Sequence, residues 1–282
     1  DAPSITILGR LLEGTGERAT STTQVAVRLL SQLLRDQSLG RYIVPIVPDE
    51  ARTFGMDGLF KQAGIYSPAG QQYTPVDADT LLPYREAADG QILQEGICEA
   101  GAMASFMAAG SAYAIHGVPT IPFYIFYSMF GFQRVGDIIW ACADMMCRGF
   151  LLGGTAGRTT LNGEGLQHQD GHSHVLASTV PSLRSYDPAF GYELATIVRD
   201  GIKRMYSDCE NCFYYLTVYN ATYPMPPLRD EPDVREGIVR GGYCFRRSSV
   251  QESRPQVHLL GSGAIMQEVL EAADLLEAEG AR

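Results

Sequence analysis

The chain has 282 residues, 45% of them hydrophobic, so it can bury a sizeable core and fits one large or two ordinary domains. Its 22 Lys and Arg against 32 Asp and Glu give a formal net charge of −10 without a basic stripe, which argues against a nucleic-acid partner. No apolar run reaches the roughly 18 residues of a membrane span, and the first four residues do not resemble a signal peptide, so we expect a cytoplasmic protein.

The predicted elements follow the order of an α/β protein. Apolar residues recur at helical spacing over 20–36, after a Thr- and Ser-rich start that can cap a helix. Strands are expected, with helical stretches between most of them, at Tyr42–Val47, Thr120–Tyr127, Phe150–Leu152, Leu183–Tyr186, Phe213–Val218 and Val257–Leu260. This alternation predicts a mainly parallel sheet flanked by helices.

A change of composition divides the chain near its C-terminal end. Residues 224–256 are rich in proline and charge, and residues 257–278 then fit one further strand and helix. We therefore expect a linker at 1–19, an α/β domain at 20–223 and a second linker at 224–256. Residues 257–282 are expected to start another α/β domain.

Two features near the first strand are candidates for function. Asp49 and Glu50 follow this strand, at the edge where α/β sheets place ligands, although Glu50 could also serve only to cap a helix starting near Arg52. The segment Pro68–Tyr84 has little periodicity and is long for an internal connection. It is either a lid or an ordinary surface excursion.

A turn at Gly96 opens a predicted helix of small and apolar residues, which suits close packing against a neighbouring element. Glu99 lies in its first turn, where a carboxylate complements the helix dipole. The functional alternative is a carboxylate in apolar surroundings, which holds its proton more tightly and can share it with a ligand nitrogen. Cys98 is expected to be a small buried packing residue.

Aromatic side chains surround the end of the predicted strand at 120–127. Alternate members should lie in the core, and the others could stack on a planar heterocycle. The members are Tyr124, Phe126, Tyr127, Phe130 and Phe132.

Residues 163–174 contain three of the five histidines and two carboxylates between glycines. Glycine lets the backbone adopt positive φ near a ligand, and imidazole and carboxylate groups transfer protons near neutral pH. This density predicts an active-site loop.

The six cysteines are expected to be reduced, because a chain of this length and hydrophobicity needs no disulfides. Cys209 and Cys212 have the spacing of a redox pair or half a zinc knuckle, but no second such pair or matching histidine pair follows. A turn before a strand is the simpler interpretation.

Five blocks of sequence occur in a fixed order: 49–56 (DEARTFGM), 65–75, 94–99 (QEGICE), 126–133 (FYSMFGFQ) and 163–174. Together they resemble the homodimeric bacterial pyruvate dehydrogenases, the decarboxylating first components of their complex. The resemblance extends from about residue 20 to the end of the sequence.

This resemblance implies a transketolase-like domain that binds the pyrimidine ring of thiamine diphosphate. The implied activity is oxidative decarboxylation of pyruvate with reductive acetylation of a lipoyl group. The implied partners are a second copy of the chain, dihydrolipoyl acetyltransferase and dihydrolipoyl dehydrogenase.

The resemblance also assigns roles by position. Glu99 matches the glutamate that protonates the pyrimidine nitrogen, and Phe130 matches the aromatic residue that stacks on the aminopyrimidine. Tyr127 matches a residue that faces the substrate. His168 matches the active-site histidine, and Glu164 matches its acidic neighbour.

Further matches lie near the first strand. Asp49 and Glu50 match carboxylates that line the site beneath the cofactor. Residues 69–85 match a mobile loop that becomes ordered over a bound intermediate, which favours the lid interpretation.

One motif of thiamine enzymes is missing from the sequence. The Gly-Asp-Gly followed by paired asparagines, which holds Mg²⁺ and the diphosphate, lies in an N-terminal domain of the family's longer chain. We therefore expect the Mg²⁺ ligands to lie outside this chain. We also expect the isolated chain to be inactive and to bind the cofactor weakly.

Two other classes of function fit parts of the sequence. A zinc-dependent hydrolase could use His168, His172 and His174 with Asp170 as metal ligands. A non-catalytic or split subunit fits the missing diphosphate motif and the small-residue helix, which suits pairing with another chain. Transketolases and enzymes for longer 2-oxo acids share the role of Glu99 but not the quoted blocks.

Overall fold

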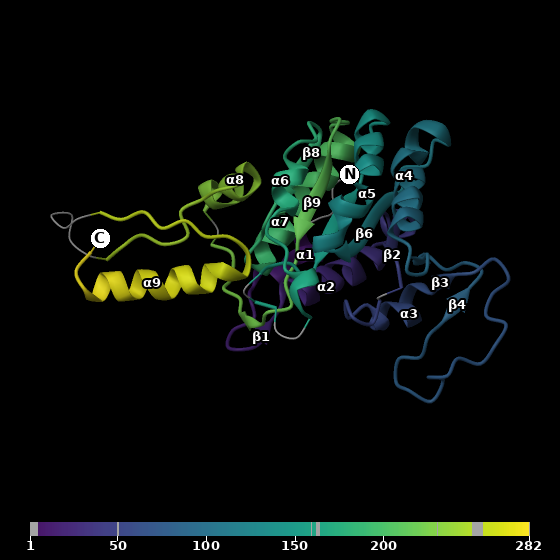
Figure 1. The fold of residues 1–282 in the computed structure, drawn as a ribbon, viewed down its shortest axis with the longest axis horizontal. Coiled ribbons are helices and arrows are strands. Elements are labelled where there is room, and N and C mark those ends of the chain that lie inside the picture. Colours follow the sequence, from purple (N-terminus) through teal and green to yellow (C-terminus); the bar gives the residue numbers. More distant parts are fainter. Residues whose placement is uncertain are drawn as a thin grey trace.

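The computed structural model describes residues 5–281 except 50, 159, 162–163, 230 and 250–255. Its centre is a parallel sheet of six strands in the order β5-β2-β6-β7-β9-β8 (Figure 1). The strands are β2 (Ile43–Val47), β5 (Leu93–Gln94), β6 (Ile121–Tyr127), β7 (Phe150–Gly154), β8 (Leu183–Tyr186) and β9 (Phe213–Thr217). The mainly parallel α/β architecture predicted from the sequence is confirmed.

Buried, nearly continuous apolar runs explain the inner strands. Every residue of β7 and β9 is buried, as in parallel sheets that helices cover on both faces. The register pairs Phe123 with Phe150 and Tyr127 with Gly154. Phe123 and Phe150 are stacked, with ring centroids 4.6 Å apart. Five of the six predicted strands occur within two residues of their expected bounds.

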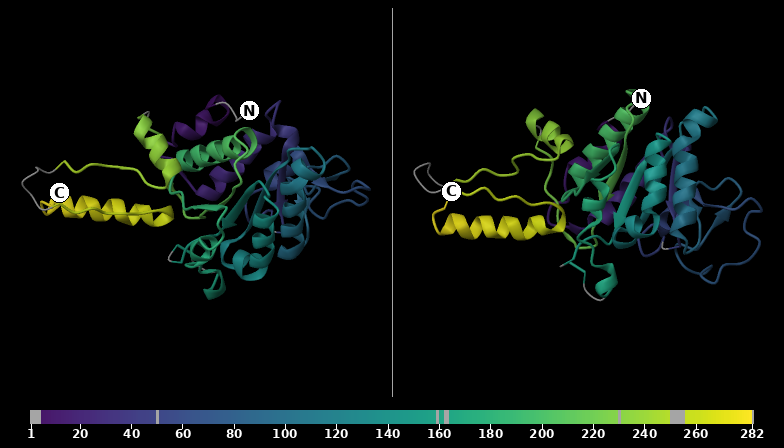
Figure 2. Two further views of the ribbon diagram at one scale, coloured as in Figure 1. Left: turned by 90° about the horizontal axis from the view of Figure 1, so that it is seen from above. Right: turned by 45° about the horizontal axis from the view of Figure 1, so that its top comes forward.

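Two groups of helices lie on opposite sides of the sheet (Figure 2). The first contains α1 (Ile5–Leu12), α2 (Thr22–Leu34) and α7 (Gly191–Ile202), which pack against one another. The second contains α4 (Glu99–Ile115), α5 (Ser128–Asp144) and the short α6 (Ser173–Ala177). The Oγ of Ser21 caps α2 by accepting a hydrogen bond from the backbone N–H of Gln24 at 3.1 Å, which agrees with the predicted cap.

Smaller elements complete this part of the fold. Strand β1 (Ala19–Thr20) pairs antiparallel with β10 (Tyr223–Pro224). Strand β3 (Ile65–Tyr66) pairs with β4 (Glu86–Ala87), and the loop between them projects on the side opposite to the C-terminal helix (Figure 1). The helix expected near Arg52 begins only at Asp57 as α3 (Asp57–Ala63), because residues 51–55 form turns.

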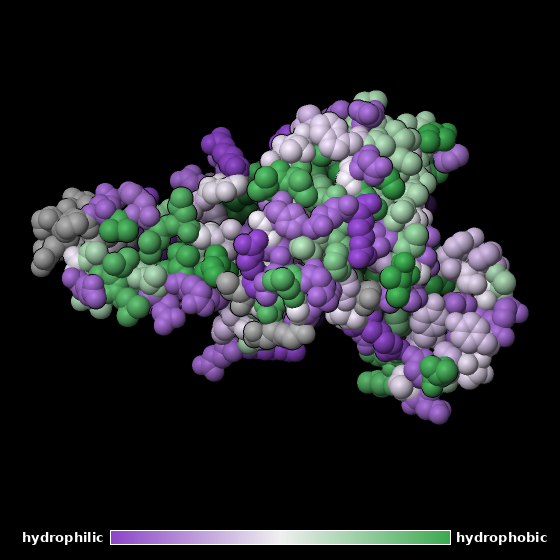
Figure 3. Space-filling model, in the orientation of Figure 1, coloured by the Kyte–Doolittle hydropathy of each residue, from purple (hydrophilic) through white to green (hydrophobic). Residues whose placement is uncertain are grey.

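The C-terminal segment departs from the prediction. After α8 (Pro232–Arg240), the expected strand Val257–Leu260 is not formed, and Leu260 is 93% exposed. Strand-like composition is insufficient when no neighbouring strand offers hydrogen bonds. Helix α9 (Met266–Ala278) then extends away from the sheet (Figure 1), and apolar side chains lie on the surface of this segment (Figure 3).

The proposed domain boundaries stay a prediction. Within the expected N-terminal linker, residues 5–12 form α1, and Leu8 is buried in the core that this helix shares with α2 and α7. Among the described residues, no helix has the length and apolar character needed to cross a membrane.

Candidate functional site

Loops at one edge of the sheet bring the predicted site residues together. Glu99 is the first residue of α4, which follows β5, and Tyr127 ends β6. Phe130 lies in the first turn of α5, and His168 ends a 3₁₀ turn at Leu166–His168, after β7. All four therefore follow carboxyl ends of parallel strands, where α/β sheets bind their ligands.

Tyr127, Phe130 and His168 form an aromatic cluster. The ring centroid of His168 lies 4.8 Å from that of Tyr127 and 5.3 Å from that of Phe130, and the two aromatic rings are 6.1 Å apart. The ring centroid of Phe54 lies 5.1 Å from that of Tyr127. Edge-to-face contacts of this kind fix ring orientation. The histidine loop thus packs against the end of β6.

Glu99 has an ionic partner that the sequence did not indicate. Its carboxylate is paired with the guanidinium of Arg134, and its side chain is 14% exposed. The carbon of this guanidinium lies 4.1 Å from the ring centroid of Phe130. The expectation that Glu99 lies in apolar surroundings is therefore wrong. A planar cation is held between the carboxylate of Glu99 and the face of Phe130.

The position of Arg134 follows from the geometry of α5. Phe130 and Arg134 are four residues apart, so they lie on the same helix face. Val135 has non-helical backbone angles (φ −132°, ψ 21°), so a kink follows Arg134 directly. The spacing of four residues could have predicted that Arg134 stacks on Phe130. No sequence pattern links Arg134 to Glu99.

Polar atoms of the described part of the histidine loop include two without a hydrogen-bond partner. These atoms are Nδ1 of His168 and Oε2 of Glu164, both buried. An unpartnered buried polar atom costs about 1 to 3 kcal/mol, and a catalytic role or a bound water or ion is among the explanations for one. Both atoms belong to the predicted active-site loop.

Asp170 anchors the end of this loop. Its Oδ1 accepts hydrogen bonds from the backbone N–H groups of His172 and Ser173, both at 3.0 Å, and its Oδ2 accepts one from Ser173 Oγ at 2.5 Å. The backbone N–H of Asp170 donates to the carbonyl of Gly157 at 3.1 Å, which closes the loop. Burial raises the pKa of Asp170, but these hydrogen bonds outweigh it, and the pKa lies below its ordinary value.

The remaining histidines make contacts elsewhere. Nε2 of His172 lies 2.9 Å from the amide nitrogen of Gln133, whereas His174 bonds to Ser185 and Thr217. Across the described ranges, no three His, Cys, Asp or Glu residues are placed to hold a metal ion. The zinc site that the histidine spacing allowed is thus not formed by these residues.

Asp49 and Cys98 follow the ends of strands β2 and β5, and both are exposed. Asp49 is exposed and accepts a hydrogen bond from the amide nitrogen of Gln94 at 2.8 Å, whereas Glu50 lies outside the described residues. Cys98 is exposed, not buried as expected, and its Sγ accepts a hydrogen bond from the N–H of Gly101 at 3.3 Å. It caps α4, because the first turn of a helix has unpaired N–H groups.

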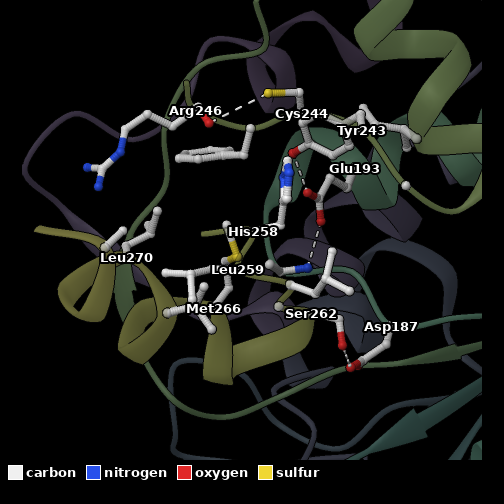
Figure 4. Close-up of a pocket in the computed structure, with 18 of the residues that line it drawn as sticks. Asp187, Glu193, Tyr243, Cys244, Arg246, His258, Leu259, Ser262, Met266 and Leu270 are labelled. Carbon is white, nitrogen blue, oxygen red and sulfur yellow. Dashed lines mark hydrogen bonds between the residues drawn. The ribbon is translucent and has the colours of Figure 1, made fainter. Parts of the chain in front are cut away.

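A cavity of about 820 Å³ is lined by none of the predicted site residues. It lies between α7, the segment after α8 and the C-terminal segment (Figure 4). Tyr243 donates a hydrogen bond to the buried Glu193 at 2.5 Å, and Ser262 donates one to Asp187 at 2.6 Å. Its walls are otherwise mostly apolar, so we do not assign it as the catalytic site.

Comparison with known proteins agrees with this arrangement. A family model described as pyruvate dehydrogenase E1 component middle domain matches residues 7–226. Proteins named pyruvate dehydrogenase E1 component are 56% identical over 98% of this chain in Cupriavidus necator and 52% identical over 98% in Escherichia coli. The chain spans 31% of the length of each of these relatives.

Solved structures support the fold. The transketolase of Leishmania mexicana has a TM-score of 0.72 at 15% identity, covering 100% of this chain and 36% of that one. The Campylobacter jejuni transketolase has a TM-score of 0.68 at 15% identity, covering 99% and 35%. At such identity the likeness shows the fold alone, and it confirms the predicted transketolase-like class.

Proposed function

The chain belongs to the family of pyruvate dehydrogenase E1 component middle domains, and we propose that it forms the pyrimidine-facing part of a thiamine diphosphate site. In the complete enzyme, the proposed activity is oxidative decarboxylation of pyruvate with reductive acetylation of a lipoyl group. Because the chain spans 31% of its relatives' length, this activity is assigned to the assembled enzyme and not to the chain alone.

One observation carries this proposal: Glu99 and Phe130 together hold a planar cation. The carboxylate of Glu99 pairs with a guanidinium that stacks on the ring of Phe130. An aminopyrimidine protonated at a ring nitrogen is also planar and cationic, and it needs the same two partners. The residues present therefore fit the pyrimidine end of thiamine diphosphate.

Bound thiamine diphosphate supplies a nucleophilic carbon and an electron sink for the loss of carbon dioxide. The residues of this chain would orient it and move protons. Glu99 would hold a proton at the pyrimidine nitrogen, and Phe130 would fix the plane of the ring. Tyr127 contacts the rings of Phe54 and His168 and would exclude water from the substrate.

The unpartnered atoms of the active-site loop fit roles toward the substrate. Nδ1 of His168 can donate or accept a proton, and Oε2 of Glu164 can accept a hydrogen bond. We assign His168 to substrate handling and reductive acetylation, with Glu164 as its acidic neighbour. Asp49 and Glu50 are assigned to the edge of the site, below the cofactor.

Mg²⁺ and the diphosphate are assigned to residues outside this chain, because the sequence lacks the Gly-Asp-Gly motif that would hold them. A second copy of the chain is the proposed partner in a homodimer. Exposed apolar side chains on α4 and α5, with Ile115 61% and Trp140 43% exposed, support a protein interface there. The acetyltransferase and dihydrolipoyl dehydrogenase of the complex are the further proposed partners.

Calorimetric titration of thiamine diphosphate with Mg²⁺ tests this assignment. The ligand is titrated into the chain, into a separately expressed N-terminal portion of the enzyme, and into their mixture. Binding only in the mixture is expected, since each part holds one end of the cofactor. Tight binding by the chain alone would overturn the division of the site, and no binding in an active mixture would overturn the cofactor assignment.

A further inference from the structure

The C-terminal end of α5 brings two cysteines together. The N–H of Cys147 donates to the carbonyl of Cys142 at 2.9 Å, and the N–H of Met146 donates to that of Ala143 at 3.1 Å. Met146 has φ +54°. This is a Schellman motif, which ends many helices. With Met145 as the C-cap, the motif brings the third-last helical residue next to the residue two positions after the cap. Both of these positions are cysteines here.

The two thiols lie together inside the core. Cys142 is 0% exposed and Cys147 is 1% exposed, and neither is in a disulfide. The two thiols interact with each other, and the thiol of Cys147 also faces the carbonyl of Met107 at 3.6 Å. The hydrogen bond with Cys142 lowers the pKa of Cys147 against the effect of burial, and the same bond raises that of Cys142.

We propose that Cys142 and Cys147 form a reversible disulfide when the protein meets a peroxide. The more acidic Cys147 is the attacking thiol and Cys142 is the resolving thiol. No part of this assignment depends on the proposed cofactor site.

The reaction balances with one molecule of hydrogen peroxide. The thiolate of Cys147 attacks a peroxide oxygen, the O–O bond breaks, and the products are a sulfenic acid and hydroxide, which takes up the released proton as water. The sulfur of Cys142 then attacks the sulfenic sulfur; the S–S bond forms and the S–O bond breaks, with loss of a second water. Two thiols lose two protons and two electrons, and the peroxide is reduced to two waters.

Peroxide can reach Cys142 and Cys147 through the C-terminal end of α5. Met145 and Met146, which lie between the cysteines, are 42% and 52% exposed. Met146 is strained, because a non-glycine residue rarely adopts positive φ. Terminal turns open locally at lower free energy than the core. Opening of this one turn exposes both sulfurs without unfolding the sheet.

Formation of the disulfide changes a contact between two helices of the site. It removes the donor that faces Met107 on α4 and ties the end of α5 to the residues before β7. Helix α4 begins with Glu99, and α5 carries Phe130 in its first turn. The oxidation state of the pair therefore acts on the packing between the helices that position these residues.

Peptide mapping tests the proposal directly. The purified protein is treated with hydrogen peroxide, remaining thiols are alkylated, and the protein is digested with trypsin. Cleavage after Arg134 and Arg148 places both cysteines on one peptide, 135–148. We expect this peptide to become about 2 Da lighter than its reduced form, to resist alkylation, and to recover both thiols with dithiothreitol.

The matched control is the pair Cys209 and Cys212, which trypsin also releases on one peptide, 205–229. Cys209 is exposed, so it meets peroxide first, but we expect it to bridge to a smaller extent because Cys212 is buried and so does not share its environment. In Cys142→Ala, Cys147 should instead be oxidised to sulfinic acid. The proposal is overturned if peptide 135–148 keeps two alkylatable thiols at a dose that converts its methionines to sulfoxides.

Discussion

Glu99 and Arg134 join the starts of two helices across the candidate site. The carboxylate begins α4, and the guanidinium lies on the first part of α5, before the kink at Val135. The ion pair is half exposed on the arginine side, with 47% of that side chain accessible, so its effect on stability is small. Its importance lies in geometry, because it fixes where the carboxylate points relative to the face of Phe130.

Replacing Glu99 by Gln in the complete enzyme should preserve the fold and slow turnover by about 10²- to 10⁴-fold, since an amide cannot pass a proton to the pyrimidine nitrogen. Turnover at saturating thiamine diphosphate, together with circular dichroism, measures both effects. Glu95→Gln is the matched control, because Glu95 is exposed just before α4 and bonds to Ser105. Turnover of Glu99→Gln close to that of the control would refute the assigned role.

Phe130→Leu should weaken thiamine diphosphate binding by roughly tenfold, since stacking on an aromatic face contributes about 0.5 to 1.5 kcal/mol beyond area burial. The fold should persist, because Phe130 is only partly buried. Calorimetry on the complete enzyme gives the affinity. The neighbouring Met129→Leu, at another partly buried position, should bind as tightly as wild type. Equal affinity of both variants would remove Phe130 from the pyrimidine site.

The sequence predicted the helices and strands better than it predicted which residues touch one another. Strand Phe150–Leu152 was predictable because a short buried apolar run gives the same pattern in any parallel sheet. Val257–Leu260 has similar composition, yet it forms no strand and pairs with none of the strands in the described part of the chain. Cys98 was expected to be buried by its residue type, but its place before α4 exposes it as a cap.

The candidate site shows the same limit. Glu99 was correctly placed in the first turn of a helix, from the glycine turn before it. Its partner Arg134 lies 35 positions away on another helix, and one sequence contains no signal for such a pair. The histidine loop was recognised by its composition, but only the structure separates His168 from His174, which faces Ser185 and Thr217.

His168→Ala should reduce lipoyl acetylation far more than cofactor affinity. Its imidazole contacts Tyr127 and Phe130 and leaves Nδ1 without a partner, a position suited to proton exchange with a substrate. Acetylation of a lipoyl domain and decarboxylation with an artificial electron acceptor, measured side by side, separate the two half-reactions. His172→Ala is the control, because His172 pairs with exposed Gln133 and with the Asp170 turn. A large loss of cofactor binding in His168→Ala would contradict its assignment to substrate handling.

Asp170→Asn should lower the free energy of unfolding by about 1 to 3 kcal/mol at neutral pH, because the amide cannot accept all the hydrogen bonds that the buried carboxylate receives. The folded-state pKa of Asp170 lies below its ordinary value of 3.8, so this stabilisation is present above 3.8 and is lost as the pH falls through the folded-state pKa. The difference between wild type and Asp170→Asn should therefore shrink on acidification.

Urea unfolding of both proteins between neutral and acid pH measures this trend. Asp36→Asn is the control: the pKa of Asp36 is also lowered through hydrogen bonds from Ser38 and Leu39, but its site is more exposed, so the loss should be smaller. A difference for Asp170→Asn that stays constant with pH would mean that the variant acts through packing and not through the charge of the carboxylate. Because the Asp170 carboxylate accepts hydrogen bonds from the backbone N–H groups of His172 and Ser173, the same variant should also increase amide exchange at these two residues.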